Sequence, residues 1–300
     1  MTSTTIGWEL YRSFLGVLTE GSLSGAARAL GITQPTVGRH IAALEKALGV
    51  VLFTRSQAGL LPTETATSLR GHAQAMESTA AALERAAGSQ GGDGVAIKGI
   101  VRVSCSDVVG VEVLPGVLAR LRESHPDLKI ELVLTDRVQD LLLREADIAV
   151  RMAAPKQEQL VARRIGRIEL GLHARRDYLD RHGTPRNVGQ LHGHSSIGYD
   201  QMTAYLRQAE KSLKGLRREQ FSLRSDSNLA QLALIRAGAG IGMCQVPLAK
   251  RDPALVRVMP KLFSLPLETW VTMHEDLRGS PRCRVTFDAL VEGMVAYANV

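Results

Sequence analysis

Five polar residues between positions 34 and 46 have types and a spacing that suit contact with duplex DNA. On a helix that turns about 100° per residue, Arg39 and Lys46 project from one side, with Gln34, Thr36 and His40 beside them. Short donors and acceptors near the start of a helix can read base edges, and cations further along can pair with phosphates. The alternative is an ordinary amphipathic helix with a solvated polar face, and these residues alone leave that alternative open.

Two short helices joined by a tight turn are predicted over residues 22–48, and they would position this polar face. Ser22 is a good N-cap for the first helix, and Gly31 allows that helix to end sharply. Thr33 is expected to cap the second helix, with Pro35 accommodated in its first turn. The inward stripe of the second helix follows spacings of four, three and four: Val37, Ile41, Leu44 and Leu48.

Elements on both sides of this pair are predicted to complete a small domain. Residues 6–19 are expected to form a first helix that packs behind the other two. After Gly49, the sequence VVLFTRSQAGLLPT has two apolar runs around a glycine-containing turn, which predicts a β-hairpin, or wing. Arg55 lies where a wing would meet the phosphate backbone or the minor groove.

The order of ITQPTVGRHIAALEKALGVVLFTR and GLLPT resembles the winged helix-turn-helix of LysR-type transcriptional regulators. The resemblance implies a DNA-binding domain over residues 1–63. Its expected DNA-contacting residues are Ser22, Thr33, Gln34, Pro35, Thr36, Arg39, His40, Lys46 and Arg55. Two positions depart from the family pattern, because Ala58 stands where a second basic residue is common and Ala66 where glycine is usual. The first departure puts one phosphate contact in doubt.

A long helix is predicted over residues 64–87, with a narrow apolar seam along one side. The seam residues alternate at three and four: Ala66, Leu69, Ala73, Met76, Ala80, Leu83 and Ala87. Such a heptad pattern is typical of a two-stranded coiled coil and predicts pairing with a second copy of the chain. The alternative is a helix that lies on its own domain, which usually shows a broader stripe. A two-fold pair would present two recognition helices to a palindromic site.

A hinge is predicted at residues 88–97, because GSQGGDG has four glycines in seven residues. Beyond it, strands and helices alternate. Strands are predicted at 100–103, 129–134, 147–150, 160–165, 168–173, 196–199, 221–224, 241–244 and 267–274, and helices at 114–122, 138–144, 175–181, 228–237 and near the C-terminus. The opening βαβαβ order predicts a parallel sheet covered on both faces, in an α+β multidomain chain.

This region also resembles the effector-binding domain of the same family, in VLPGVLARLRESHPDLKIEL, ADIAVRM and NLAQLALIRAGAGIGM. The resemblance implies that residues 98–300 form two α/β subdomains of periplasmic-binding-protein type. The first would comprise about 98–167 and 271–300, and the second about 168–270, so the chain would cross between them twice.

Ligands of open α/β sheets bind at the carboxyl ends of strands, and polar residues follow several of the predicted strands here. The expected effector-binding residues are Ser104, Ser106, Thr135, Arg151, Ser195, Ser196, Ser227, Asn228 and Met243. Hydroxyls, an amide and one arginine suit a small anion. Two alternatives stay open: Ser227 and Asn228 cap the following helix, and Arg151 pairs with a neighbouring acid.

Composition limits the classes of protein that fit. The net charge is +7, but residues 1–61 hold five Lys/Arg against three acids, so the DNA-binding prediction rests on arrangement. No apolar run approaches the roughly 18 residues of a membrane span, and no secretion signal is visible, so we expect a cytoplasmic chain with no membrane partner. Three scattered cysteines and the absence of a catalytic pattern predict no metal, no cofactor and no enzyme activity.

The sequence therefore predicts a transcription regulator whose DNA binding responds to a small molecule. Its expected partners are double-stranded DNA, the effector, a homodimeric or homotetrameric assembly of itself and, if it is an activator, RNA polymerase. One alternative is an α/β solute-binding protein or enzyme with an incidental helical N-terminus. Another is a DNA-binding protein whose cleft takes no ligand.

Overall fold

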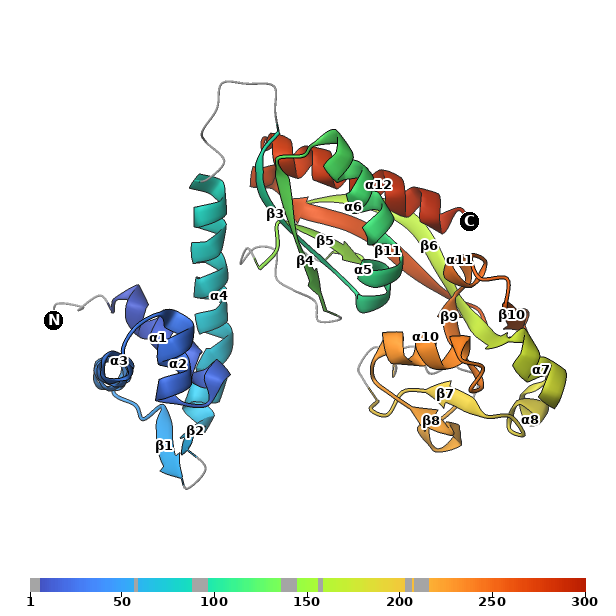
Figure 1. Ribbon diagram of the computed structural model, residues 1–300, viewed down its shortest axis with the longest axis horizontal. Helices are drawn as coiled ribbons and strands as arrows, with labels where there is room; N and C mark the ends of the chain where they lie inside the picture. The colour runs from blue at the N-terminus through green and yellow to red at the C-terminus, as the bar shows by residue number, and fades with distance from the viewer. Residues whose placement is uncertain are drawn as a thin grey trace. The chain divides into compact units, whose positions relative to one another are not determined.

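The computed structural model describes residues 6–56, 59–87, 97–135, 145–155, 159–202, 207 and 216–300. The chain divides into two compact units (Figure 1). The N-terminal unit includes the elements up to α4, and the C-terminal unit includes every later element. Within the described residues, no helix is long and apolar enough to cross a membrane.

Three helices, a hairpin and a long helix make up the N-terminal unit. They are α1 (Trp8–Glu20), α2 (Leu23–Leu30), α3 (Gln34–Leu48), the antiparallel strands β1 (Phe53–Ser56) and β2 (Gly59–Pro62), and α4 (Glu64–Ala87). Phe14, Val17, Ala26, Val37 and Leu44 belong to its buried core. The predicted helices and wing are therefore confirmed, since one apolar stripe from each of the first three helices meets in a common core.

The turns between these helices follow the sequence closely, with two exceptions. The Ser22 hydroxyl accepts a hydrogen bond from the Gly25 amide at 3.0 Å, and Gly31 ends α2 in the left-handed region with φ 69°. Thr33 is the N-cap residue of α3 as predicted, but within the described residues its side chain accepts from no backbone amide and instead meets the Thr36 hydroxyl at 2.8 Å. Leu48 is 36% exposed, because the end of α3 extends past the core.

In the described part of the C-terminal unit, a nine-stranded mixed sheet forms the centre. Its strands are β3 (Gly99–Cys105), β4 (Leu128–Leu134), β5 (Ile148–Arg151), β6 (Leu160–Arg175), β7 (Ser196–Gly198), β8 (Leu223–Arg224), β9 (Ile241–Gln245), β10 (Leu255–Val258) and β11 (Leu265–His274). The order is β4-β3-β5-β11-β6-β9-β7-β8, with β10 beside β6. β3 pairs parallel with β4 and β5, as predicted, but β11 and β6 run antiparallel, so the sheet is not purely parallel.

Helices cover this sheet in two lobes, which Figure 1 separates clearly. They are α5 (Asp107–Glu112), α6 (Leu114–Ser124), α7 (Arg176–His182), α8 (Val188–Leu191), α10 (Asn228–Arg236), α11 (Val246–Ala249) and α12 (Pro281–Ala298). We call the lobe with β3–β5, α5, α6 and α12 subdomain I, and the lobe with β7–β10, α7, α8, α10 and α11 subdomain II. The strands β6 and β11 extend through both.

The two crossover strands pair along their length and bend at one place. β6 is a single strand of 16 residues, where the sequence predicted two strands separated by Gly166. Gly166 has φ 138°, a value that only glycine adopts readily, and the register of β11 shifts opposite it, between Thr269 and Trp270. The strand therefore continues through the irregularity instead of ending there.

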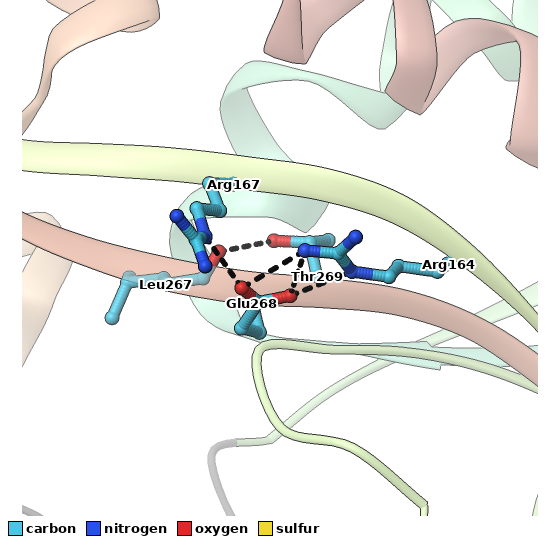
Figure 2. Close-up of polar contacts among 5 residues, drawn as sticks. All are labelled: Arg164, Arg167, Leu267, Glu268 and Thr269. Atoms are coloured by element: carbon cyan, nitrogen blue, oxygen red, sulfur yellow. Dashed lines mark hydrogen bonds and ion pairs between the residues drawn. The ribbon is translucent and has the colours of Figure 1, made fainter.

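An ion-pair cluster fastens the two crossover strands beside this bend (Figure 2). The Glu268 carboxylate accepts from Arg164 at 2.8 and 3.0 Å and from Arg167 at 2.6 Å. These hydrogen bonds, first those from Arg164, lower the pKa of Glu268 to about 2, so it stays ionised at any ordinary pH. The Thr269 hydroxyl donates to the Leu267 carbonyl at 3.1 Å in the same cluster.

Four further elements differ from the sequence prediction. The helices α5, α8 and α11 and the strand β10 were not predicted, because four to six residues are too few to display a period. The predicted helix at 138–144 and the hinge residues 88–96 lie outside the described residues.

Candidate DNA-binding face and effector cavity

The outward side of α3 carries most of the residues expected to contact DNA. Gln34, Pro35, Arg39 and Lys46 are exposed, and Thr36 is half-buried. Arg39 Nη2 donates to the Thr36 hydroxyl at 3.3 Å, which holds the guanidinium along the helix surface. Together with the Thr33 hydroxyl, these groups form a continuous polar line on the first turns of α3.

His40 does not belong to this exposed set. It is half-buried, and its Nδ1 lies 2.7 Å from the Ser13 hydroxyl of α1. His40 therefore lies at the edge of the face, half-buried like Thr36, with one ring nitrogen engaged by a buried serine of the first helix, and its contact with DNA stays a prediction. This contact with Ser13 joins α3 to α1 and helps to fix the rotation of α3 about its own axis.

A second polar contact, which sequence reasoning missed, fastens α3 to the wing. Glu45 Oε1 accepts from the backbone amides of Leu52 at 2.7 Å and Phe53 at 3.2 Å. These amides lie at the start of β1, so the carboxylate sets where the hairpin leaves the helix. The only hint in the sequence was an acid beside the inward stripe. Arg55 pairs with Leu60 in the hairpin register, but its side chain lies outside the described residues.

The seam of α4 divides into two parts. Ala66 and Ala73 are buried in the core of their own unit, with Leu69 packed against it, so these positions are not open to a second copy. This corrects the prediction of a seam that faces a partner throughout. Further along, Met76 is 40% exposed and Leu83 is 72% exposed. Ala80 is half-buried, and the side chain of Ala87 lies outside the described residues.

A cavity of about 560 Å³ lies between subdomains I and II, in the size range of sites for small organic ligands. Six of the nine residues predicted for the effector line it. They are Ser106, Thr135 and Arg151 from subdomain I, and Ser196, Asn228 and Met243 from subdomain II. The rule that ligand sites form at the carboxyl ends of strands located this cavity correctly.

Arg151 is held in a defined position at the end of β5. Its Nη2 donates to the Ser104 hydroxyl at 2.7 Å, and its Nη1 donates to the Val150 carbonyl at 3.0 Å. Ser104 is fully buried, so it orients the arginine from behind and does not itself line the cavity. Trp270 of β11 lies directly opposite Arg151 in the strand register.

Two other predicted residues serve local structure. Ser227 Oγ accepts from the Ala230 amide at 3.3 Å, so it caps α10, and the Ser195 amide donates to the Tyr178 hydroxyl at 2.9 Å. In the part of the chain that the structure describes, neither is among the cavity-lining residues. The capping alternative was therefore correct for Ser227, whereas Asn228 lines the cavity.

Most of the cavity wall is apolar, and sequence reasoning missed this. Tyr199 and Phe221 line it as an edge-to-face pair with ring centroids 5.1 Å apart. These rings lie at the ends of predicted strands 196–199 and 221–224, where an aromatic search could have found them. Leucines of the crossover strands, among them Leu170 and Leu267, could not have been assigned without knowing how β6 and β11 cross.

The charged and reactive groups of the wall are few. Among the described lining residues, Arg151 and Asp226 carry charge, and Asp226 Oδ1 accepts from the amides of Asp200 and Gln201 at 3.0 and 2.9 Å. Burial raises the pKa of the Cys244 thiol to about 12, which keeps it protonated and unreactive. Within the described residues, no group of three or more His, Cys, Asp or Glu could hold a metal ion. The arrangement suits binding of an organic molecule with an acidic group.

Comparison with known families assigns both units. Residues 8–67 match the model for the bacterial regulatory helix-turn-helix protein of the lysR family, and residues 96–295 match the model for the LysR substrate binding domain. The transcriptional regulator CrgA of Neisseria meningitidis serogroup C is 27% identical over 290 residues, which are 93% of this chain and 94% of CrgA. A transcriptional regulator of Xanthomonas campestris is 28% identical over 184 residues, which are 61% of this chain but only 53% of that protein.

Solved structures share the fold. Full-length CbnR, complexed with its target DNA, superposes with a TM-score of 0.63 at 18% identity, over 97% of this chain and 100% of CbnR. CrgA of Neisseria meningitidis superposes with a TM-score of 0.56 at 24% identity, over 95% of this chain and 98% of CrgA. At these identities the likeness concerns the fold alone.

Proposed function

Because the chain belongs to the LysR family of transcription regulators, we propose that it binds duplex DNA as a two-fold pair whose affinity for DNA changes when a small organic anion occupies the cavity. Its two units match the family's DNA-binding and substrate-binding domains, so the chain is a DNA-binding transcription regulator and not an enzyme. The observation that carries the DNA part of the proposal is the exposed polar line of α3, which the core, His40 and Glu45 hold in place.

On DNA, each group on α3 would have a distinct role. Gln34 and Thr36, on the first turn, are suited to hydrogen bonds with base edges in the major groove. Arg39 can reach a guanine or a phosphate, and Lys46, near the helix end, a phosphate. The Ser22, Thr33 and Pro35 positions lie beside them, and Arg55 would contact the backbone from the wing. The CbnR complex with its target DNA has the same fold, which supports this use of the N-terminal unit.

Pairing of two chains would use the exposed part of the α4 seam. Met76, Ala80 and Leu83 follow one another at helical spacing, and the burial of large side chains such as Leu83 would stabilise a dimer. A two-fold dimer would place two α3 helices on a palindromic site. Resemblance to the family favours a further step from dimer to tetramer.

The effector would be a small acid with an apolar body. Its acidic group would meet Arg151, Ser106 and Thr135, and its body would contact the Tyr199–Phe221 side of the cavity. Binding can change the DNA affinity only if the ligand prefers one arrangement of the assembly, because the shift equals its differential affinity. As a regulator that acts on DNA, the chain would work in the cytoplasm, and it would contact RNA polymerase if it is an activator.

Selection of DNA from a random pool tests the DNA part of the proposal. The full-length chain should enrich an inverted repeat whose half-sites lie one helical turn, or a multiple of it, apart. Arg12→Ala, on the exposed side of α1, is a control that should enrich the same sequence. Enrichment of a single half-site would contradict the two-fold arrangement, and no enrichment would contradict sequence-specific binding.

Thermal shift with a panel of carboxylates tests the effector part. A true ligand raises the melting temperature with its concentration, by mass action. The response should be lost in Arg151→Met and kept in Arg102→Met, a control arginine that pairs with Glu131 within subdomain I. An unchanged response in Arg151→Met would remove this residue from the site, and a panel without any response would favour a cleft that takes no small acid.

A further inference from the structure

Two helices from opposite subdomains carry parts of the cavity wall. Ser106 and Val108, at the start of α5, line it from subdomain I. Asn228, Gln231 and Leu232, in the first turns of α10, line it from subdomain II. The separation of α5 and α10 therefore contributes to the width of the cavity.

An ion pair joins the far ends of the same two helices. Arg236 of α10 donates through Nη1 to Glu112 Oε1 at 2.6 Å and through Nη2 to Oε2 at 2.8 Å. The hydrogen bond from Arg236 is the main cause that lowers the pKa of Glu112. Both oxygens of the carboxylate and two donors of the guanidinium are used, which fixes orientation as well as distance. The Glu112 side chain is only 20% exposed and that of Arg236 36%, so water screens the pair less than it would on an open surface.

Further contacts run from this pair back to the cavity. Arg251 Nη1 donates to the Glu112 carbonyl at 3.3 Å, and its guanidinium lies 4.8 Å from the centre of the Tyr297 ring on α12. The Tyr297 hydroxyl, which is buried, donates to Gln245 Oε1 at 2.6 Å, and Gln245 lines the cavity. The subdomain boundary beside the cavity is thus held by a connected set of directional contacts, of which the Glu112–Arg236 pair is the charged one.

We propose that Glu112 and Arg236 are positioning residues that hold the two walls of the effector cavity at their working separation. Within the described residues, neither side chain lines the cavity, so they act through α5 and α10. Loss of one partner leaves a partly buried charge unpaired and lets the helices separate. The effector role of this pair rests on the proposed function, whereas its control of the wall separation does not.

Hydrogen exchange of the full-length, ligand-free protein tests the wall separation directly. In Glu112→Gln and in Arg236→Gln, amides of α5 and α10 should exchange about five-fold faster or more. In the charge-reversed double variant Glu112→Arg/Arg236→Glu, the exchange of these amides should slow again to nearly the rate of the unaltered protein. Arg102→Gln is the matched control, because it breaks a pair of 3.0 Å between β3 and β4 inside subdomain I and should leave α10 unchanged. The proposal would be overturned if the exchange rates of these amides were unchanged in both single variants. It would also be overturned if the amides exchanged as fast in the double variant as in the single ones.

A ligand titration separates positioning from general stability. In a Trp8→Phe background, Trp270 is the remaining tryptophan, and it lies opposite Arg151. With benzoate as the probe, the half-saturating concentration should rise about three-fold or more in each single variant, and fall back in the charge-reversed one. A rise in Arg102→Gln of the same size would overturn a specific role for the pair. If benzoate binds no variant, the choice of an aromatic acid as effector fails, and the exchange result alone decides the positioning claim.

Discussion

The DNA-binding face and the effector cavity are built in opposite ways. The face comes from one helix, α3, and successive groups on it are no more than about two turns apart. The cavity takes its walls from residues between Ser106 and Leu267, which lie on strands and helices of two subdomains. A local surface can change by a single substitution without moving its neighbours, whereas a cavity assembled from distant segments depends on everything that holds those segments apart. A substitution that impairs one of the two sites should therefore leave the other intact.

The largest expected effect comes from the core beneath the DNA-binding face. Leu44 is fully buried in the N-terminal unit, so Leu44→Ala should destabilise that unit by about 2–5 kcal/mol. Unfolding followed by Trp8 should shift to lower temperature, while unfolding followed by Trp270 should not. Single-tryptophan variants read the two transitions separately, and Gln74→Ala, exposed on α4, serves as the control. Equal shifts at both tryptophans would contradict the independence of the two units.

Acid should weaken the C-terminal unit through one buried histidine. Burial lowers the pKa of His173 to about 4, below the value of about 6.5 in an unfolded chain. Between pH 4 and pH 6.5 the unfolded state therefore binds more protons at this histidine than the folded state does. The contribution of His173 to the free energy of unfolding is complete above pH 6.5 and is lost as the pH falls to 4. Over this range the free energy of unfolding should fall by about 3 kcal/mol.

Denaturant unfolding followed by Trp270 from pH 7 to pH 4 measures this loss. His173→Gln should flatten the pH dependence, and the exposed His192→Gln should leave it intact. An undiminished pH dependence in His173→Gln would assign the effect to other groups.

A smaller effect is expected in the exposed part of α4, which belongs to neither site. Leu83→Glu, in the exposed part of α4, should weaken self-association by about 1.5–3 kcal/mol for each copy, because a leucine would no longer be buried at the seam. Sedimentation equilibrium measures the dissociation constant. Gln74→Glu places the same charge on the other side of α4 and should leave the constant unchanged. Equal constants for the two variants would remove the seam from the dimer.

The same contrast, between local features and contacts of distant segments, explains which parts of the structure could be predicted from the sequence. Elements α1 to α4 and the wing followed from periodicity and caps, because each depends on residues a few positions apart. The contact of His40 with Ser13 and the burial of Ala66 in the core of its own unit were missed for one reason: both depend on residues of a different helix. A periodic pattern tells which side of a helix is apolar, but not whether a neighbour reaches a polar side chain.

In the cavity, the sequence located the strand ends but not the wall. Ser106 and Arg151 line the cavity because they stand at the carboxyl ends of β3 and β5, whereas Ser104 lies within β3 and is buried. Several apolar residues of the wall, among them Leu170, Met243 and Leu267, come from β6, β9 and β11, whose crossing cannot be inferred from local patterns. The bend at Gly166 was taken for a break between two strands, because glycine ends a strand as readily as it bends one.

If the outward side of α3 reads DNA, removal of two of its polar groups should weaken binding to DNA. The affinity of Gln34→Ala/Arg39→Ala for the selected DNA is compared with that of the unaltered chain, by gel shift at a fixed salt concentration. We expect the affinity to fall about ten- to a hundred-fold, with folding and self-association intact. Unchanged affinity would contradict this role of α3, since a helix face that can lose both groups without effect is not the surface that recognises DNA.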